Sequence, residues 1–261
     1  MNRFLVGLVC LAVVGCSPEE GILSSLGSSF EITAENGLAI AREGWDSVAL
    51  VNAVSLIESS RQLKAQMPRA TQTVDCLSSG SISATTSSNG FNDASVPKFE
   101  ASGSFKVVTS YSNCSNSIGV FGTKQNGQQT LEQSWTGYDA TTDEFAKISI
   151  ALTYLNLSTS DSVTGETFKD GAINGVVEGA TTTTEWDLSL SSSATNDEIL
   201  TSETTTGVIT NDADSYASDG AWIIKGANDT TVVSTVVANG LDISINGAQA
   251  VTLTWSELDA L

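Results

Sequence analysis

Apolar and polar residues alternate with a period of two along much of the chain from Thr71 onward, and this pattern constrains the fold more than any other feature. Successive side chains of a β-strand point to opposite faces, so each alternating run predicts a strand with one apolar and one polar face. The clearest runs are Phe105/Val107/Tyr111, Ile148/Ile150/Leu152/Tyr154, Trp186/Leu188/Leu190, Leu241/Ile243/Ile245 and Val251/Leu253/Trp255. One face on a core and one face in water is typical of antiparallel sheets.

Asn-Gly and Asp-Gly dipeptides recur along the same region and predict tight turns, because both positions tolerate the positive φ that type I′ turns require. They are Asn126-Gly127, Asp170-Gly171, Asn174-Gly175, Asp219-Gly220, Asn239-Gly240 and Asn246-Gly247. The best candidate hairpin runs from Val232 to Ile245 around Asn239-Gly240. Because Pro97 is the last proline, every later residue can donate to a sheet ladder. We predict a mainly β fold over residues 71–261: an antiparallel meander of about ten to twelve strands, either a curved sheet or a partly open barrel.

One segment before this region has a helical pattern instead. Leu38, Ala41, Trp45 and Val48 recur at steps of three and four residues, which places them on one face of a helix. Pro68 cannot donate to a helix and marks the end of the pattern. We therefore predict one or two helices within residues 35–70, packed on the apolar face of the sheet.

The first residues have the pattern of an export signal. Arg3 is followed by an apolar run over residues 4–14, too short for the roughly 20 residues of a spanning helix. The sequence Val13-Val14-Gly15-Cys16 resembles the end of a bacterial lipoprotein signal peptide, which implies that residues 1–15 are removed and Cys16 is lipidated. Ser17 follows, where an Asp would imply retention in the inner membrane. An ordinary signal peptide that contains a cysteine is the alternative. Residues 16–34 would then form a tether.

Charge and the absence of histidine exclude several functions. The chain carries 30 acidic and 11 basic residues, no histidine, and a net charge of −19. Residues 148–261 hold 16 acids and only two bases, Lys169 and Lys225. Such a surface repels nucleic-acid phosphates and anionic lipid headgroups, so we expect no nucleic-acid partner. Without histidine, Ser-His-Asp triads, Cys-His dyads and imidazole metal sites are impossible.

The four cysteines have different expected fates. Cys10 leaves with the signal peptide, and Cys16 takes the lipid. Cys76 and Cys114 remain as an even pair in an oxidising compartment, where a disulfide is expected. Such a bond closes a loop of about 38 residues and stabilises the fold by roughly 3–4 kcal/mol in the chain-entropy model. Two free buried thiols are the alternative.

Two groups of carboxylates are candidate sites. Asp212, Asp214 and Asp219 lie in one Asx-rich stretch and supply oxygens of the kind that Ca²⁺ prefers, although Asx residues also cap turns without an ion. Glu185 and Asp187 flank Trp186 on a predicted strand, so both carboxylates share the face opposite the indole. Glycosidases use two carboxyl groups at such a separation, but solvated strand faces carry acid pairs routinely. The five tryptophans, Trp45, Trp135, Trp186, Trp222 and Trp255, fit core positions better than a binding platform.

Three patches resemble a group of uncharacterised bacterial lipoproteins with Thr/Ser/Gly-rich antiparallel β bodies. They are Asp75-Cys76 with Gly80-Ser81-Ile82-Ser83, then Tyr111-Ser112-Asn113-Cys114-Ser115 followed by Asn126-Gly127, and finally residues 220–226 with Asn239-Gly240 and Trp255-Ser256-Glu257-Leu258. The resemblance implies fold and location only.

The sequence as a whole predicts a non-catalytic cell-envelope lipoprotein with a structural or binding role. We expect it to be held at the outer membrane by the lipid on Cys16 and to face the periplasm or the cell surface. A protein or glycan partner is left open. No cofactor is expected, with Ca²⁺ as the alternative. Two alternatives are a calcium-stabilised surface adhesion or carbohydrate-binding module and, less favoured, a carboxylate-based hydrolase.

Overall fold

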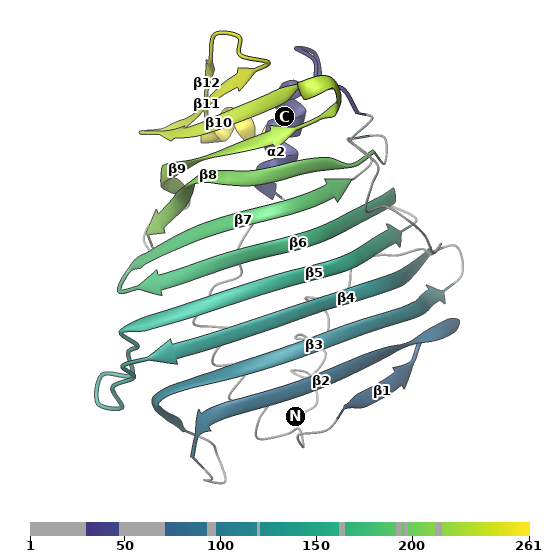
Figure 1. Cartoon of the computed structure of the whole chain (residues 1–261), viewed down its shortest axis with the longest axis vertical. Helices are drawn as coiled ribbons and strands as arrows, with labels where there is room; N and C mark the ends of the chain where they lie inside the picture. Colours follow the sequence, from purple (N-terminus) through teal and green to yellow (C-terminus); the bar gives the residue numbers. More distant parts are fainter. Residues whose placement is uncertain are drawn as a thin grey trace.

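The fold is one twelve-stranded antiparallel sheet in which every strand pairs with its neighbours in sequence (Figure 1). The computed structural model describes residues 30–46, 71–92, 98–118, 121–161, 165–191, 195, 198–211 and 216–261. The strands are β1 (Gln72–Asp75), β2 (Ser79–Phe91), β3 (Phe99–Ile118), β4 (Phe121–Thr136), β5 (Lys147–Asp161), β6 (Gly165–Glu178), β7 (Thr181–Ser191), β8 (Leu200–Asn211), β9 (Ala217–Lys225), β10 (Thr231–Val237), β11 (Gly240–Ile245) and β12 (Val251–Thr254). The predicted mainly β meander is confirmed. Of the two expected forms the structure is an open sheet, with β1 and β12 at opposite ends of the strand order.

The strand register assigns side chains to two faces. Ile173 is paired with Trp186 on one side and with Leu152 on the other, and all three belong to the main core or pack against it. We call this side the apolar face. The neighbouring positions Asn174 and Glu185 are also paired and are exposed, which defines the polar face. The predicted alternation of apolar and polar positions is therefore confirmed across β5–β7.

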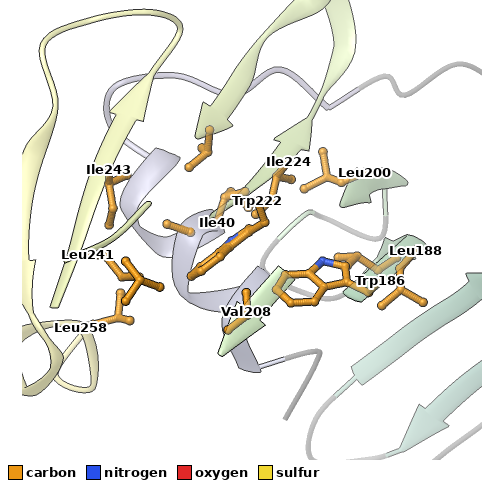
Figure 2. Close-up of a cluster of buried hydrophobic side chains, with 14 of the residues drawn as sticks. Ile40, Trp186, Leu188, Leu200, Val208, Trp222, Ile224, Leu241, Ile243 and Leu258 are labelled. Atoms are coloured by element: carbon orange, nitrogen blue, oxygen red, sulfur yellow. The ribbon is translucent and has the colours of Figure 1, made fainter. Parts of the chain in front are cut away.

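The main core lies on the apolar face between the sheet and helix α2 (Gly37–Asp46). Ile40 of α2 is buried among Trp222, Ile224 and Ile243, as Figure 2 shows. Gly44 lets α2 approach β9 closely, because a Cβ at this position would collide with Ile224. The predicted packing of a helix on the sheet is thus confirmed for residues 37–46. The remainder of the predicted helical segment, residues 47–70, lies outside the described residues.

A second, smaller aromatic core lies where β2 meets β3 and β4 meets β5. Trp135 contacts Phe91 and Phe99 edge-on, with ring centroids 5.0 and 5.3 Å apart. Tyr138 and Phe145 of the loop between β4 and β5 pack against the same cluster. These rings tie the two loops together at one end of the long strands.

The predicted hairpin between Val232 and Ile245 is confirmed, but its turn differs from the expected one. Val237 pairs with Gly240, so the loop consists of residues 238 and 239, and Gly240 is already the first residue of β11. Gly240 does not have the positive φ of a type I′ turn. Glycine is needed there because β12 passes so close that a Cβ would collide with the carbonyl of Leu253.

The dipeptide Asn246-Gly247 forms the predicted kind of turn. Both residues have positive φ, 51° and 72°, as a type I′ turn requires. The amide of Ala248 donates to the carbonyl of Ile245 at 2.9 Å and closes the turn between β11 and β12.

Four other Asx-Gly dipeptides were predicted to be hairpin turns, and this prediction is wrong. Asn174-Gly175 lies within β6 in regular pairing. The other three, Asn126-Gly127, Asp170-Gly171 and Asp219-Gly220, lie within strands next to shifts of register. Their glycines have φ of 105°, 118° and 129°. Positive φ serves a β-bulge as well as a turn, because a bulge also needs backbone that L-residues rarely adopt.

The bulges of adjacent strands are aligned into a row across the sheet. Asn113 of β3 and Asn156 of β5 both have φ of 46° and sit at the bulges opposite the Asx-Gly pairs. The amide of Asn156 donates to Asp170 Oδ1 at 2.9 Å. Since a bulge increases local twist and bends its strand, a row of them bends the sheet along one line.

Candidate functional surface

A disulfide connects Cys76 and Cys114, as the sequence predicted. The S–S distance is 2.01 Å and the Cα atoms lie 5.5 Å apart. Cys76 follows β1 and Cys114 lies in β3, so the bond spans the intervening strand β2. Two backbone contacts hold the same loop, since Leu77 N donates to Asn116 Oδ1 and Ser78 N donates to the carbonyl of Ser115, both at 2.8 Å. The β1 edge is therefore fastened to the sheet.

The predicted calcium ligands are only partly within the described residues. Asp212 and Asp214 lie outside them, as does the predicted lipidation site Cys16. Asp219 is exposed on β9, and its Oδ1 accepts the amide of Gly220 at 2.7 Å. Within the described residues, His, Cys, Asp and Glu side chains form no group of three or more that could hold a metal. Asp219 thus has a local role in the bulge at Gly220.

The carboxylates of Glu185 and Asp187 lie on the polar face, opposite the buried Trp186, as expected from the alternation. Both side chains are exposed. Asp187 pairs across the strands with Glu203, whose carboxylate forms an ion pair with Lys225 at 2.5 Å. These groups therefore stand in a solvated row of charges on the sheet surface.

Cross-strand ion pairs recur on the polar face. Lys106 of β3 contacts Glu132 of β4 at 3.0 Å, and Lys147 of β5 contacts Glu178 of β6 at 2.7 Å. Each of these side chains is about half exposed, so each pair contributes at most about 1 kcal/mol. The face is a broad polar surface, with exposed side chains on successive strands such as Glu132, Asn174 and Glu185.

The tryptophans belong to the cores, as predicted. Trp135, Trp186, Trp222 and Trp255 are buried, and Trp45 of α2 is partly buried against the main core. The Trp45 ring lies 5.7 Å from that of Trp222 and 5.3 Å from that of Trp255. Trp186 donates its indole N–H to Ser202 Oγ at 3.0 Å. These rings supply packing area and leave no exposed aromatic platform among the described tryptophans.

The segment that precedes α2 is attached to the end of the sheet at β9–β12. The amide of Ala227 donates to the carbonyl of Phe30 at 2.7 Å, and the amide of Ile32 donates to Thr230 Oγ1 at 3.0 Å. Asn246 Nδ2 donates to the carbonyl of Ile32 at 2.8 Å. We call this set of contacts, together with the packing of α2, the tether junction, because it includes Phe30 and Ile32, which fall within the predicted tether and are buried.

The tether junction continues at the last helix, α4 (Trp255–Leu258). Arg42 of α2 donates through Nη1 to the carbonyls of Leu258 at 3.2 Å and Asp259 at 2.5 Å. Tyr216 stacks on Trp255 with centroids 4.9 Å apart and donates to Asp259 Oδ2 at 2.7 Å. This hydrogen bond raises the pKa of Tyr216, since the carboxylate accepts the phenolic proton. Sequence analysis missed the junction, because no local pattern links residues 30–46 to the far end of the chain.

Two titratable groups are buried on the apolar face. The ammonium of Lys169 lies 5.7 Å from the ring centroid of Tyr154, within cation–π range. Burial lowers the pKa of Lys169, and the carboxylate of Glu43 on α2 acts in the opposite direction. Burial also raises the pKa of Tyr154 to about 12.

Comparisons with known proteins do not assign the chain to a family. No family model, no curated protein and no solved structure matches it. Neither helix in the described part of the chain is long and apolar enough to cross a bilayer.

Proposed function

We propose that this protein is a lipid-anchored lipoprotein of the cell envelope with a non-catalytic, structural or binding role. The observation that carries the proposal is the disulfide between Cys76 and Cys114. Disulfides persist in oxidising compartments, so the bond supports export of the chain. It agrees with the signal-like pattern that ends at Cys16, which would supply the lipid anchor.

The polar face supports a binding or scaffolding role. Eleven interstrand spacings of about 4.8 Å separate β1 from β12, so the sheet is roughly 50 Å across. Exposed acidic and amide side chains cover this face over several strands, as on β4, β6 and β7. A broad, charged and nearly continuous surface is suited to contact with another macromolecule or to spacing.

The hydrolase alternative is less well supported. Glu185 and Asp187 are exposed to water on an open strand face. Of the three calcium candidates Asp212, Asp214 and Asp219, only Asp219 lies within the described residues, and its carboxylate accepts a backbone amide. Neither alternative has an observation that favours it over a structural or binding role.

Membrane fractionation tests the anchor. The full chain with a C-terminal tag is expressed in a bacterium that processes lipoproteins, beside a Cys16→Ala variant as the matched control. We expect the parent protein to sediment with membranes and the control to be released into the soluble fraction. If both fractionate with membranes alike, the lipid anchor is refuted.

Protease treatment of intact cells then separates the two possible locations. Loss of the C-terminal tag from intact cells would place the body outside and favour adhesion or ligand capture. Survival of the tag until the outer membrane is opened would favour a periplasmic scaffold. Thiol labelling of the denatured protein before and after reduction checks the compartment, because Cys76 and Cys114 should react only after reduction.

A further inference from the structure

The tether junction fixes which end of the sheet is closest to the point of attachment. Residues 30–46 form hydrogen bonds with the connection between β9 and β10, with Asn246 after β11, and with the end of the chain at α4. Helix α2 also packs against β9, β10 and β11. In Figure 1 these strands lie at the top of the long axis and β1 and β2 at the bottom. A force or constraint applied at the start of the chain therefore acts on β9–β12.

We infer that the body stands end-on at the membrane, with β9–β12 proximal and the disulfide-bonded β1–β3 end distal. This inference rests on the proposed lipid anchor at Cys16. Fourteen residues separate Cys16 from Phe30 and span at most about 50 Å when fully extended. The junction at β9–β11 therefore stays within this distance of the lipid surface. The β1 edge, several strand spacings further away, reaches nearly twice as far.

The charge of the proximal end limits how closely it can approach the membrane. The sequence from residue 198 to residue 261 contains one basic residue, Lys225. Its acidic residues are Glu198, Glu203, Asp212, Asp214, Asp219, Asp229, Asp242, Glu257 and Asp259. Anionic headgroups repel such a surface over about one Debye length, roughly 8–10 Å. The proximal end is thus held near the membrane by the chain and kept off its surface by charge.

The inference identifies the surface that a partner would meet first. It is the β1–β3 end, where the disulfide fastens β1 to β3 and where Val74 and Leu77 are 65% and 75% exposed. The polar face then lies perpendicular to the membrane and is accessible along its length. The body would act as a spacer that presents one rigid end outward.

Fluorescence quenching on vesicles tests the orientation. Single cysteines are introduced at Gln249, Asn174 and Ser87, which are exposed on the β11–β12 loop, β6 and β2. Each is labelled with a thiol-reactive fluorophore under non-reducing conditions, and the parent protein checks that Cys76 and Cys114 do not react. The lipidated proteins are incorporated into vesicles of phosphatidylcholine and phosphatidylglycerol that contain a headgroup-labelled acceptor dye, so that energy transfer quenches the fluorophore over tens of ångströms.

We expect quenching to be strongest at Gln249→Cys, weaker at Asn174→Cys and weakest at Ser87→Cys. Equal quenching at the three positions, or the reverse order, would overturn the inference. A parallel set in which six histidines replace residues 1–16 is bound to nickel-chelating vesicles, which attaches the same start of the chain without a lipid. If this set shows the gradient and the natural chain does not bind vesicles, the proposed anchor fails and the orientation stands. If both sets bind without a gradient, the orientation alone fails.

Discussion

Removal of the Cys76–Cys114 disulfide gives the most direct test of how the sheet is stabilised. The two cysteines are separated by 38 positions in the sequence. In the chain-entropy model a closed loop of this length stabilises the folded state by about 4 kcal/mol, because the bond restricts the unfolded chain. The model assumes that β1–β3 unfold together with the remainder of the sheet. The measured loss therefore reports whether the twelve strands form one cooperative unit.

The experiment compares three forms of the unlipidated Cys16→Ala chain in urea: oxidised, reduced, and with both cysteines replaced by alanine. The oxidised and reduced forms have identical side-chain volume apart from two hydrogens, so their difference isolates the bond. The double variant adds the cost of a cavity at Cys114, which is completely buried. We expect the reduced form to lose about 3–4 kcal/mol of unfolding free energy and the double variant somewhat more.

Two probes separate the unfolding of the main core from the unfolding of the whole sheet. Tryptophan fluorescence reports mainly on Trp45, Trp186, Trp222 and Trp255 of the main core, whereas far-ultraviolet circular dichroism reports on all strands. If reduction lowers stability by less than about 1 kcal/mol at the fluorescence transition, β1–β3 unfold on their own and the cooperative assumption is refuted. Coincident transitions that both shift by the expected amount would support a single unit.

Three further predictions concern the bulges, the buried tyrosine and the tether junction. Gly171→Ala should lower the unfolding free energy by more than the about 1–3 kcal/mol of backbone strain alone, because a Cβ there also collides with the Asp187 carbonyl. Gly179→Ala is the control, since Gly179 has a positive φ but open space around it. Equal losses in urea titrations of the two variants would contradict a role for the close approach of the strands. Burial raises the pKa of Tyr154 to about 12, so its contribution to the unfolding free energy is complete below about pH 10 and is lost as the pH rises toward 12. Urea titrations should show that the parent loses about 2–3 kcal/mol more than Tyr154→Phe over this pH range. Parallel curves for the two proteins would exclude a raised pKa of Tyr154. Arg42→Ala should lower the unfolding free energy by about 1–2 kcal/mol through the lost donation to the carbonyl of Asp259. Arg42→Lys should lose nearly as much in urea titrations, and an Arg42→Lys chain as stable as the parent would show that the guanidinium geometry is unimportant.

The alternation of apolar and polar residues was sufficient to predict the fold class, the strand faces and the position of the core. It worked because strands such as β7 and β10 have one face on a core, so burial acts with the period of the strand itself. The disulfide was predictable because the predicted signal peptide and lipidation site account for Cys10 and Cys16 and leave an even pair. The helix was predictable where its stripe covers the sheet, and the structure confirms this for residues 37–46.

The tether junction could not be predicted, because its contacts join residues more than 190 positions apart. Asn246 illustrates the difficulty. The sequence identifies it as a turn residue, and it does adopt a positive φ of 51°. Its side chain, however, also donates to the carbonyl of Ile32 and accepts the amide of Thr231, and neither partner is visible from local pattern.

The Asx-Gly dipeptides show why local chemistry predicts backbone conformation better than it predicts topology. Asn and Gly report that the chain adopts positive φ, and this was correct at Gly127, Gly171 and Gly220. Whether positive φ reverses the chain or only bulges it depends on how far the partner strand continues. Where β5 runs on for 15 residues against β6, Asp170-Gly171 has paired neighbours on both sides and becomes a bulge. β11 ends at Ile245, so Asn246-Gly247 lies beyond the regular strand pairing and becomes a turn. The decisive information therefore lies in strand length, which is a property of the whole sheet.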